Sequence, residues 1–519
     1  MSKQLAQCVI FLGTWGALAV LHPCAALELS VLEAQGKQIY TKGTSPFGND
    51  ISAKVGATSV SLPASTMPCN SCHGRDGLGR PEGGVIPANI QWANLSKSYG
   101  GQSASGRRFP QYTSEFFFRA VTRGLDPGGN RLDSTMPRYG LQKNDADALL
   151  AYLKRIQDES DPGVSRDNIT LGTVLPKGPG VSALAEAIES VLRAYVADVN
   201  KNGGLFGRKL VLRIAYADSQ QDVLTKVEQM LSSEQVFALL NPFSATVDEE
   251  LSLLAESYAT PVIAPYTNKP QISGRRHTFY LFGGMSTQSR ALVSQAQKRF
   301  GAKAVAVMFA QTKTPQPNLQ QALAPAGAAS LQLPYDPASP MPDGAAKTLQ
   351  QGRISAVVFL GAEPHLRQFL QSAEKLAWFP HMYVPGATVG ASVLAAPLGF
   401  DAKIHLAYPF LISGHDPENT QVFAGFYQRH KLNRNHLNAK IRAYAACALT
   451  VEALKRSGKR VGRESFIDAL EHMGEFKTGM LPPLSFGPGK RVGAHGIYLL
   501  QADLAQKMLR PEADWIQLR

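Results

Sequence analysis

The sequence predicts a multidomain chain in which a small all-α domain is followed by a larger α/β domain. Three observations support this prediction. Residues 30–157 hold short segments with apolar residues at helical spacing, as in "QKNDADALLAYLKRI". The charged stretch "DESDPGVSRDN", which contains proline and glycine, is typical of a linker. From residue 169 onward, strand-like apolar runs alternate with helical patterns, which indicates a parallel sheet covered by helices.

The first residues have the pattern of an export signal. A lysine precedes an apolar run over residues 9–21, and small residues follow as far as Ala26. The run is shorter than the roughly 20 residues that a membrane-spanning helix needs, so we expect a cleaved signal peptide over residues 1–26. A lipid anchor at Cys24 stays open as an alternative. The mature chain is therefore expected in the periplasm, without a membrane span.

Composition narrows the classes of function. The 519 residues carry 53 Lys and Arg against 40 Asp and Glu, a formal net charge of +13. These charges are dispersed along the chain, which is typical of a solvated basic surface, so we expect no nucleic-acid partner. Five cysteines are too few for a disulfide framework in an exported chain of this length. Cys447 lies among alanines in a helical pattern and is predicted to be buried and structural.

Two cysteines lie close together in the motif Cys69-x-x-Cys72-His73. A zinc site needs about four ligands, and no further Cys or His lies near the motif. A thioredoxin-like motif would follow a strand, whereas this one follows a segment rich in Gly, Ser and Pro. The remaining chemistry is covalent haem attachment, in which both thiols bond the porphyrin and the adjacent histidine binds the iron. We therefore expect one covalently attached haem c.

The second axial ligand of such a haem has few candidates. Residues 27–160 contain one histidine, His73, and two methionines, Met67 and Met136. Met67 lies only two residues before Cys69 and would have to reach around the porphyrin. Met136 lies far downstream and precedes Pro137, which restricts it to an extended backbone. The sequence therefore predicts His73 and Met136 as the iron ligands.

Residues 30–157 resemble a class I c-type cytochrome. The resemblance lies in Gly36 and Tyr40 of the first helical segment, in the cysteine motif, in "RAVTRGLDPGGNRLDSTMPRYGL" and in the last helix, "ALLAYLKRI". Without a side chain, Gly36 would allow a close crossing of the first and last helices. It implies an all-α domain over residues 27–160, with thioether bonds at Cys69 and Cys72. It also implies one-electron transfer, because protein groups fill both axial positions. The segment between Tyr40 and the motif is longer than is usual in this family and has the composition of a loop.

Residues 169–519, which follow the linker at 161–168, resemble the type I periplasmic solute-binding proteins of the branched-chain amino-acid class. The most specific stretches are "YVADVNKNGGLFGRKLVLRIAYADSQ", "ALLNPFSATVDEE" and "TPVIAPYTN". The resemblance implies two α/β lobes that close on a ligand. Three chain crossings are expected near Gly283, Ser413 and Pro482. The first lobe would comprise residues 169–283 and 413–481, and the second lobe residues 284–412 and 482–519.

The same resemblance places ligand contacts on polar loops after two strands of the first lobe. These loops contain Ser244, Ala245, Thr246, Tyr266, Thr267 and Asn268. Hydroxyls and backbone N–H groups on a loop that leads into a helix suit an anionic group. Glu363 follows a strand of the second lobe and could meet a ligand amine. Helix capping is the alternative for these residues, as in a capping box between Thr246 and Glu249, or an acid at a helix start for Glu363.

The function expected first is that of a periplasmic c-type cytochrome, an electron carrier with a fused domain for a small organic ligand. Its partner would be a periplasmic dehydrogenase or oxidase. The alternative is the receptor of an ABC importer, which docks on a permease and carries the haem as an ancillary group. We expect no enzymatic activity, because the loops near the ligand show no nucleophile with an adjacent base.

Overall fold

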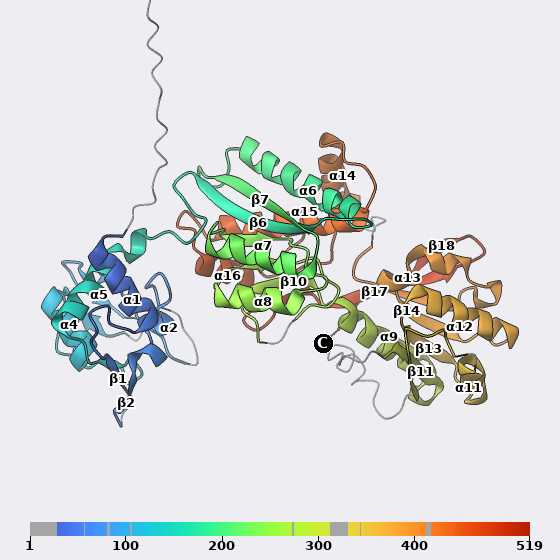
Figure 1. Cartoon of the computed structure of the whole chain (residues 1–519), viewed down its shortest axis with the longest axis horizontal. Coiled ribbons are helices and arrows are strands. Elements are labelled where there is room, and N and C mark those ends of the chain that lie inside the picture. Colours follow the sequence, from blue (N-terminus) through green and yellow to red (C-terminus); the bar gives the residue numbers. More distant parts are fainter. Residues whose placement is uncertain are drawn as a thin grey trace, which may run out of the picture. The chain divides into compact units, whose positions relative to one another are not determined.

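The computed structural model describes residues 29–518, except 57, 80–83, 104–105, 272–273, 312–330, 343 and 412–416. The expected signal peptide, the alternative lipid anchor at Cys24 and the crossing expected at Ser413 therefore lie outside the described residues. The chain divides into two compact units, and the division falls between Glu159 and Ser160. Figure 1 labels many of the elements of both units.

The first unit is mainly helical. Its helices are α1 (Val31–Lys42), α2 (Cys69–His73), α3 (Trp92–Leu95), α4 (Ser114–Arg123) and α5 (Lys143–Arg155). A capping box begins α1: the Ser30 N–H donates to the Glu33 carboxylate at 2.7 Å, and the Glu33 N–H donates to the Ser30 hydroxyl at 3.3 Å. The helix ends at Gly43, whose φ of 64° is accessible to glycine without steric cost.

The expectation of an all-α first domain is wrong in one respect, because this unit also contains two small antiparallel sheets. They are formed by β1 (Ser52–Val55), β2 (Val60–Pro63) and β5 (Arg138–Tyr139), and by β3 (Gly101–Gln102) and β4 (Arg108–Phe109). The first two strands come from the segment that we expected to be a loop. Ala53 of β1 is fully buried and pairs with Leu62 on one side and Tyr139 on the other. The inserted hairpin therefore has a place in the core.

Helices α1 and α5 cross at Gly36. A Cβ atom built on Gly36 would lie 1.9 Å from the Ala148 carbonyl oxygen and 2.8 Å from the Tyr152 Cβ, so only glycine fits. The prediction of a close crossing at Gly36 is thereby confirmed. One turn later, the rings of Tyr40 and Tyr152 lie 5.4 Å apart, and the Tyr40 hydroxyl donates to the Gly74 carbonyl at 2.5 Å. The crossing thus fixes the segment that follows His73.

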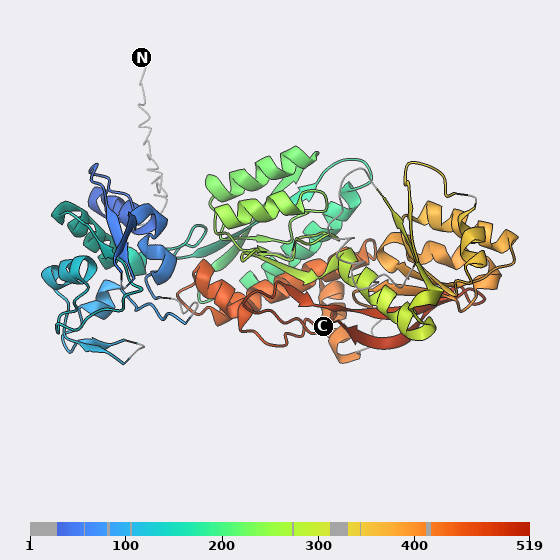
Figure 2. The ribbon, with the colours of Figure 1, turned by 90° about the horizontal axis from the view of Figure 1, so that it is seen from below.

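The second unit begins with a parallel six-stranded sheet of order β16-β10-β9-β8-β6-β7. Its strands are β6 (Asn168–Pro176), β7 (Lys209–Ala217), β8 (Ala238–Leu240), β9 (Val262–Ile263), β10 (Thr278–Phe282) and β16 (Val492–Ala494). Figure 2 shows α7 (Gln220–Ser232) and α8 (Asp248–Ser257) on one face and α15 (Leu437–Arg456) and α16 (Arg463–Glu471) on the other. Separate apolar cores fill the two interfaces, and α6 (Ser182–Lys201) shares the core of α15.

A seven-stranded sheet forms the other lobe, with the order β12-β11-β13-β14-β15-β17-β18. Its strands are β11 (Val305–Ala310), β12 (Leu331–Tyr335), β13 (Ala356–Leu360), β14 (His381–Pro385), β15 (Ile404–Tyr408), β17 (Gly496–Asp503) and β18 (Met508–Gln517). The first five strands pair in parallel, whereas β17 and β18 are antiparallel additions. Helix α9 (Gly284–Phe300) packs on one face, and α11 (Ala345–Gln351) and α12 (Glu363–Lys375) pack on the other.

The chain passes between the two sheets at Gly283, which lies between β10 and α9. The last crossing is at His495, and its expected position at Pro482 is wrong. Val492 of β16 pairs with Tyr280 of β10 and so adds a strand to the first sheet, and the second sheet resumes at Gly496. Residues 482–494 therefore belong to the first lobe, because their apolar side chains complete its core.

The segment expected as a linker, residues 161–168, packs on the second unit. The Arg463 N–H donates to the Asp161 carboxylate at 2.6 Å, and the Thr170 N–H donates to the Gly163 carbonyl at 2.7 Å. A Cβ on Gly163 would lie 2.1 Å from the Phe237 nitrogen. This segment is therefore part of the fold of the second unit.

The Gly36→Ala variant tests the crossing of α1 and α5. The added methyl group collides with backbone, so we expect a loss of about 1–3 kcal/mol in the free energy of unfolding of the first unit. Urea denaturation followed by circular dichroism measures it. Gly344→Ala is the matched control, because a Cβ there meets nothing within 4 Å. Equal midpoints for the two variants would contradict the crossing.

Candidate functional site

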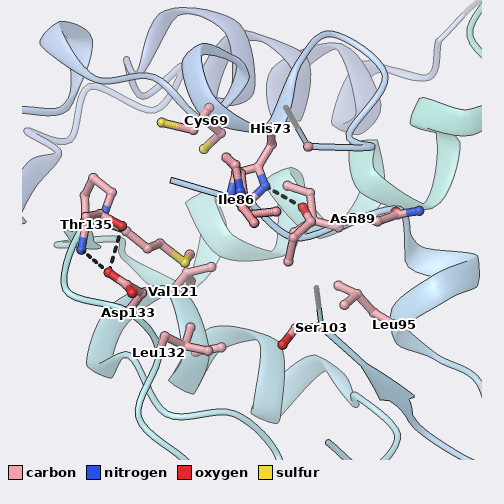
Figure 3. A pocket seen from close by; sticks show the side chains of 18 of the residues that line it. Cys69, His73, Ile86, Asn89, Leu95, Ser103, Val121, Leu132, Asp133 and Thr135 are labelled. Carbon is pink, nitrogen blue, oxygen red and sulfur yellow. Dashed lines mark hydrogen bonds between the residues drawn. The ribbon is translucent and has the colours of Figure 1, made fainter. Parts of the chain in front are cut away.

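A cavity of about 670 Å³ in the first unit brings together the four side chains that the sequence singled out. Cys69, Cys72, His73 and Met136 all line it. Figure 3 shows Cys69 and His73 on one side of the cavity and Leu132, Asp133 and Thr135 on the segment across from them. Most of the other lining residues are apolar, among them Ile86, Leu95, Phe117, Val121, Leu149 and Leu153.

The one-turn helix α2 positions the cysteine motif. Its N-cap, Pro68, has an extended backbone and is followed at once by Cys69. Residues three apart lie on the same side of a helix, so the thiols of Cys69 and Cys72 are neighbours on one side of this turn. The helix ends at His73, and the next residue is Gly74, with a φ of 73°. The turn therefore presents two thiols and one imidazole to a single cavity.

The tautomer of His73 is fixed by its surroundings. Its Nδ1 lies 2.8 Å from the Ala88 carbonyl oxygen, which only accepts, so Nδ1 carries the proton. Burial lowers the pKa of His73, against the opposing effect of this hydrogen bond, because the side chain is only 8% exposed. A neutral ring protonated at Nδ1 leaves a lone pair on Nε2. This is the arrangement that metal-binding histidines use.

The surroundings of the thiols bear on the redox and zinc alternatives. Burial raises the pKa of Cys69 to about 12, which disfavours the thiolate that a disulfide exchanger needs. The three cysteines that the structure describes form no disulfide. In the described part of the chain, no group of three or more His, Cys, Asp or Glu side chains could hold a metal ion.

A rigid loop holds Met136 at the cavity. The N–H and the hydroxyl of Thr135 donate to the Asp133 carboxylate at 2.9 Å and 2.8 Å (Figure 3), and these bonds lower the pKa of Asp133. The guanidinium of Arg138 donates to the Leu132 carbonyl at 2.8 Å and also to the Met136 carbonyl. The backbone on both sides of Met136 is thus tied down.

The sequence did not predict the buried ion pair between Arg107, which lines the cavity, and Asp126. Asp126 is fully buried and also accepts from the backbone N–H of Asn130 at 2.9 Å and from its side-chain amide. Burial alone would raise the pKa of Asp126, but the hydrogen bonds from Asn130 and Arg107 together lower it. In the sequence, Asp126 begins the turn "DPGGN", and this turn gives no indication that Arg107 is the partner of Asp126.

These residues fit a covalently attached haem. Two thiols, a neutral imidazole with a lone pair and a thioether surround one apolar cavity, and this is the donor set of a haem c with His and Met ligands. The cavity volume lies in the range of roughly 300–1,000 Å³ that small-molecule and cofactor sites occupy. Haem attachment remains a prediction at this point.

In the second unit, the structure brings the two predicted ligand loops side by side. Phe243 and Tyr266 form a parallel bridge, their rings stack with centroids 5.8 Å apart, and the Ser244 N–H donates to the Tyr266 carbonyl at 3.3 Å. The buried Thr267 hydroxyl accepts from the Lys269 N–H at 3.0 Å. Asn268 is exposed, and its carbonyl accepts from the Met285 N–H.

The capping alternative for Thr246 is wrong. Helix α8 has Val247 as its N-cap and no side-chain hydrogen bond there, and both Ala245 and Thr246 are exposed. The loop is held instead by the Ser244 hydroxyl, which donates to the buried Asp248 carboxylate at 2.7 Å. Ser244 therefore has a structural partner already.

Glu363 is the first residue of α12 in the second lobe, where the helix dipole favours an acid. Its carboxylate accepts from the Arg367 guanidinium one turn later, at 3.0 Å. The structure thus pairs Glu363 within its own helix.

The sequence profile of the periplasmic binding protein family matches residues 168–507. The chain belongs to this family, which confirms the resemblance of the second unit to solute-binding proteins. No curated protein sequence matches the chain. The family match does not include the first unit, so the prediction of a haem site there rests on the residues alone.

Solved structures of similar fold agree with this family match. A branched-chain amino-acid ABC transporter protein from Thermus thermophilus with bound valine shares 16% identity, with a TM-score of 0.54 over 68% of this chain and 98% of the other. A fatty acid ABC transporter substrate-binding protein from Thermomonospora curvata shares 15% identity, with a TM-score of 0.53 over 69% and 95%. A leucine-binding protein from Thermotoga maritima shares 13%, with a TM-score of 0.51 over 67% and 99%.

Among the described residues, no helix has both the length and the apolar composition needed to cross a membrane.

The Asp126→Ala variant tests the ion pair at the cavity. It leaves the Arg107 guanidinium without its partner, so we expect a loss of about 3 kcal/mol in the stability of the first unit. The folded pKa of Asp126 lies below its unfolded value of about 3.9, so this stability is complete above that pH and is lost as the pH falls through the folded pKa.

The control is Asp147→Ala, which removes an exposed pair with Lys143 and should cost about 0.5 kcal/mol or less. Thermal unfolding from pH 7 to about pH 2 measures both variants across the window in which Asp126 titrates. An Asp126→Ala protein that keeps the wild-type stability and pH profile would show that the pair does not support the cavity.

Proposed function

We propose that this protein is an exported solute-binding receptor of the ABC importer type that carries one covalently attached haem c. The family match supports solute binding in the second unit. The haem rests on one observation, the convergence of Cys69, Cys72, His73 and Met136 on a single cavity. The expected location is the periplasm.

Each of the four residues has one role in this proposal. Cys69 and Cys72 would hold the haem by thioether bonds, and His73 Nε2 and Met136 Sδ would bind its iron. The bound haem would supply one-electron transfer, because two protein ligands would leave the iron no site for a substrate. The Ala88 carbonyl keeps the lone pair of His73 on Nε2, and the apolar walls exclude water.

Solute capture would use the first-lobe loops at residues 244–246 and 266–268, with closure of the second lobe over the ligand. The structures of similar fold include amino-acid and fatty-acid binders, so a small organic solute is the expected ligand class. A membrane permease would then be the partner. Glu363 is a less favoured ligand contact, because Arg367 already pairs with it.

A second candidate function is electron transfer to or from a periplasmic dehydrogenase or oxidase, with the solute-binding unit as a sensor or docking module. The observation in its favour is the donor set itself, with His73 buried and Met136 half-buried, because an iron held by two protein ligands suits outer-sphere transfer. The importer function has the wider support, because the family match covers the larger unit.

The haem can be tested by solvent extraction and optical spectroscopy after expression with haem-attachment machinery. Colour should stay with the denatured protein in acidified organic solvent, and oxidised protein should show the near-infrared sulfur-to-iron band. Met136→Ala should lose the band, and the control Met67→Ala should keep it, although Met67 also lines the cavity. Colour that moves into the solvent, or a band lost only in Met67→Ala, would refute the assignment.

Solute binding can be tested by thermal unfolding with a panel of amino acids, short-chain acids, amides and alcohols. A ligand at 100 times its dissociation constant should add about 2.7 kcal/mol to the stability of the second unit. Thr267→Ala should weaken binding by about 10-fold or more if its hydroxyl meets a charged group. Thr225→Ala on α7 is the control. A panel without any shift would count against the receptor function.

A further inference from the structure

Arg442, on α15, lies directly beside the predicted ligand loop. Its guanidinium carbon is 4.4 Å from the centre of the Tyr266 ring and 5.9 Å from that of Phe282. Its Nη2 donates to the Thr267 carbonyl at 2.9 Å. Two of these three partners belong to the loop at 266–268, and the third, Phe282, immediately precedes the crossing at Gly283.

This guanidinium has no acidic partner among the residues that the structure describes. Its Nε is inaccessible to solvent and makes no hydrogen bond there, although the side chain as a whole is partly exposed. Burial lowers the pKa of Arg442, and Tyr266 opposes this only in part. By contrast, the buried Arg491 pairs with Glu471 at 2.6 Å. A partly buried cation without an anionic partner is less favourable than a paired one, so a site of this kind suits an anion from outside.

The location favours a ligand over a purely structural role. Parallel sheets of this kind bind ligands at the carboxyl ends of their strands, and both Tyr266 and Phe282 follow or end such strands. The Phe282 ring stacks on Phe410, with centroids 5.4 Å apart. Arg442 thus lies over an aromatic floor, where a bound carboxylate would pair with a cation already held in place.

We propose that Arg442 binds the anionic group of the solute, and that the solute is an organic acid without an ammonium group. This inference rests on the proposed solute-binding function and names the ligand class for it. A zwitterionic amino acid would also need a carboxylate from the protein for its ammonium group.

Two carboxylates that could meet a ligand ammonium group, Asp248 beside the first-lobe loops and Glu363 in the second lobe, are already engaged. Asp248 is buried and accepts from the Ser244 hydroxyl at 2.7 Å, from the Tyr280 hydroxyl at 2.8 Å and from the Gln271 N–H at 2.9 Å. Burial also raises the pKa of Asp248. In the second lobe, Glu363 pairs with Arg367. Both of these carboxylates thus have other partners, whereas Arg442 has no acidic partner among the described residues.

The test uses the full chain and matched pairs of probes that differ only in charge. The pairs are valerate with valeramide and benzoate with benzamide, and valine is the zwitterionic probe. The variants are Arg442→Met, which keeps the apolar stem without the charge, and Arg442→Lys, which keeps the charge without the planar fork. Arg429→Gln is the control, because Arg429 is exposed and pairs with Asp198 at the surface.

We expect an acid of at least one pair to raise the melting temperature of the wild type, and its amide and valine to have no effect at the same concentration. Arg442→Met should weaken binding of that acid by about 100-fold, as expected when a charged hydrogen-bond partner is removed. The affinity of Arg442→Lys for the acid should lie between those of the wild type and Arg442→Met. Arg429→Gln should bind the acid like the wild type. Without probe, Arg442→Met should melt close to the wild type, because removal of the unpaired charge offsets the lost hydrogen bond to the Thr267 carbonyl.

Several outcomes would overturn the inference and leave solute binding intact. These are equal binding of acid and amide, tightest binding of valine, or unchanged acid affinity in Arg442→Met. A markedly lower melting temperature of probe-free Arg442→Met would show that the guanidinium is a structural element with a partner inside the protein. If no probe shifts the wild type, both this inference and the solute-binding part of the proposed function fail.

Discussion

The free energy of burying a polar or charged group without a partner is the constraint on which both sites depend. In the first unit, His73 avoids this cost by donating its Nδ1–H to the Ala88 carbonyl, which leaves Nε2 as the available nitrogen in the cavity. Arg107 and Asp126 avoid the cost by forming an ion pair. In the second unit, Arg442 offsets the cost only in part, through contacts with two aromatic rings and one carbonyl. The completed pairs stabilise the fold, whereas the incompletely paired Arg442 indicates a ligand site.

The fold creates these environments by close packing. The crossing of α1 and α5 at Gly36 brings Tyr40 to the Gly74 carbonyl and so fixes the end of the cysteine motif. In the second unit, strand pairing has the corresponding role. The bridge between Phe243 and Tyr266 aligns two loops at one edge of the first sheet. The antiparallel strands β17 and β18 complete the second sheet after the last crossing, so the C-terminal residues belong to the opposite lobe from β16.

Local patterns predicted much of this architecture. The cysteine motif, the glycine at the helix crossing and the alternation of strands and helices each depend on neighbours in sequence, so they could be identified before the structure. The hairpin at β1 and β2, the pairing of Arg107 with Asp126 and the crossing at His495 depend on distant segments, and the sequence did not reveal them. The role of Arg442 was not predictable for the same reason. In the sequence it is an ordinary helical arginine, and only the fold places the Tyr266 ring against it.

The central claim is that a haem iron lies between His73 and Met136 in a solute-binding protein. Diffraction from crystals of the matured protein, with data collected on both sides of the iron absorption edge, tests it most directly. The account predicts one anomalous peak, within bonding distance of His73 Nε2 and Met136 Sδ, and continuous density from the porphyrin to the sulfurs of Cys69 and Cys72. A peak bound by other residues, or a cavity without iron beside intact thiols, would contradict it.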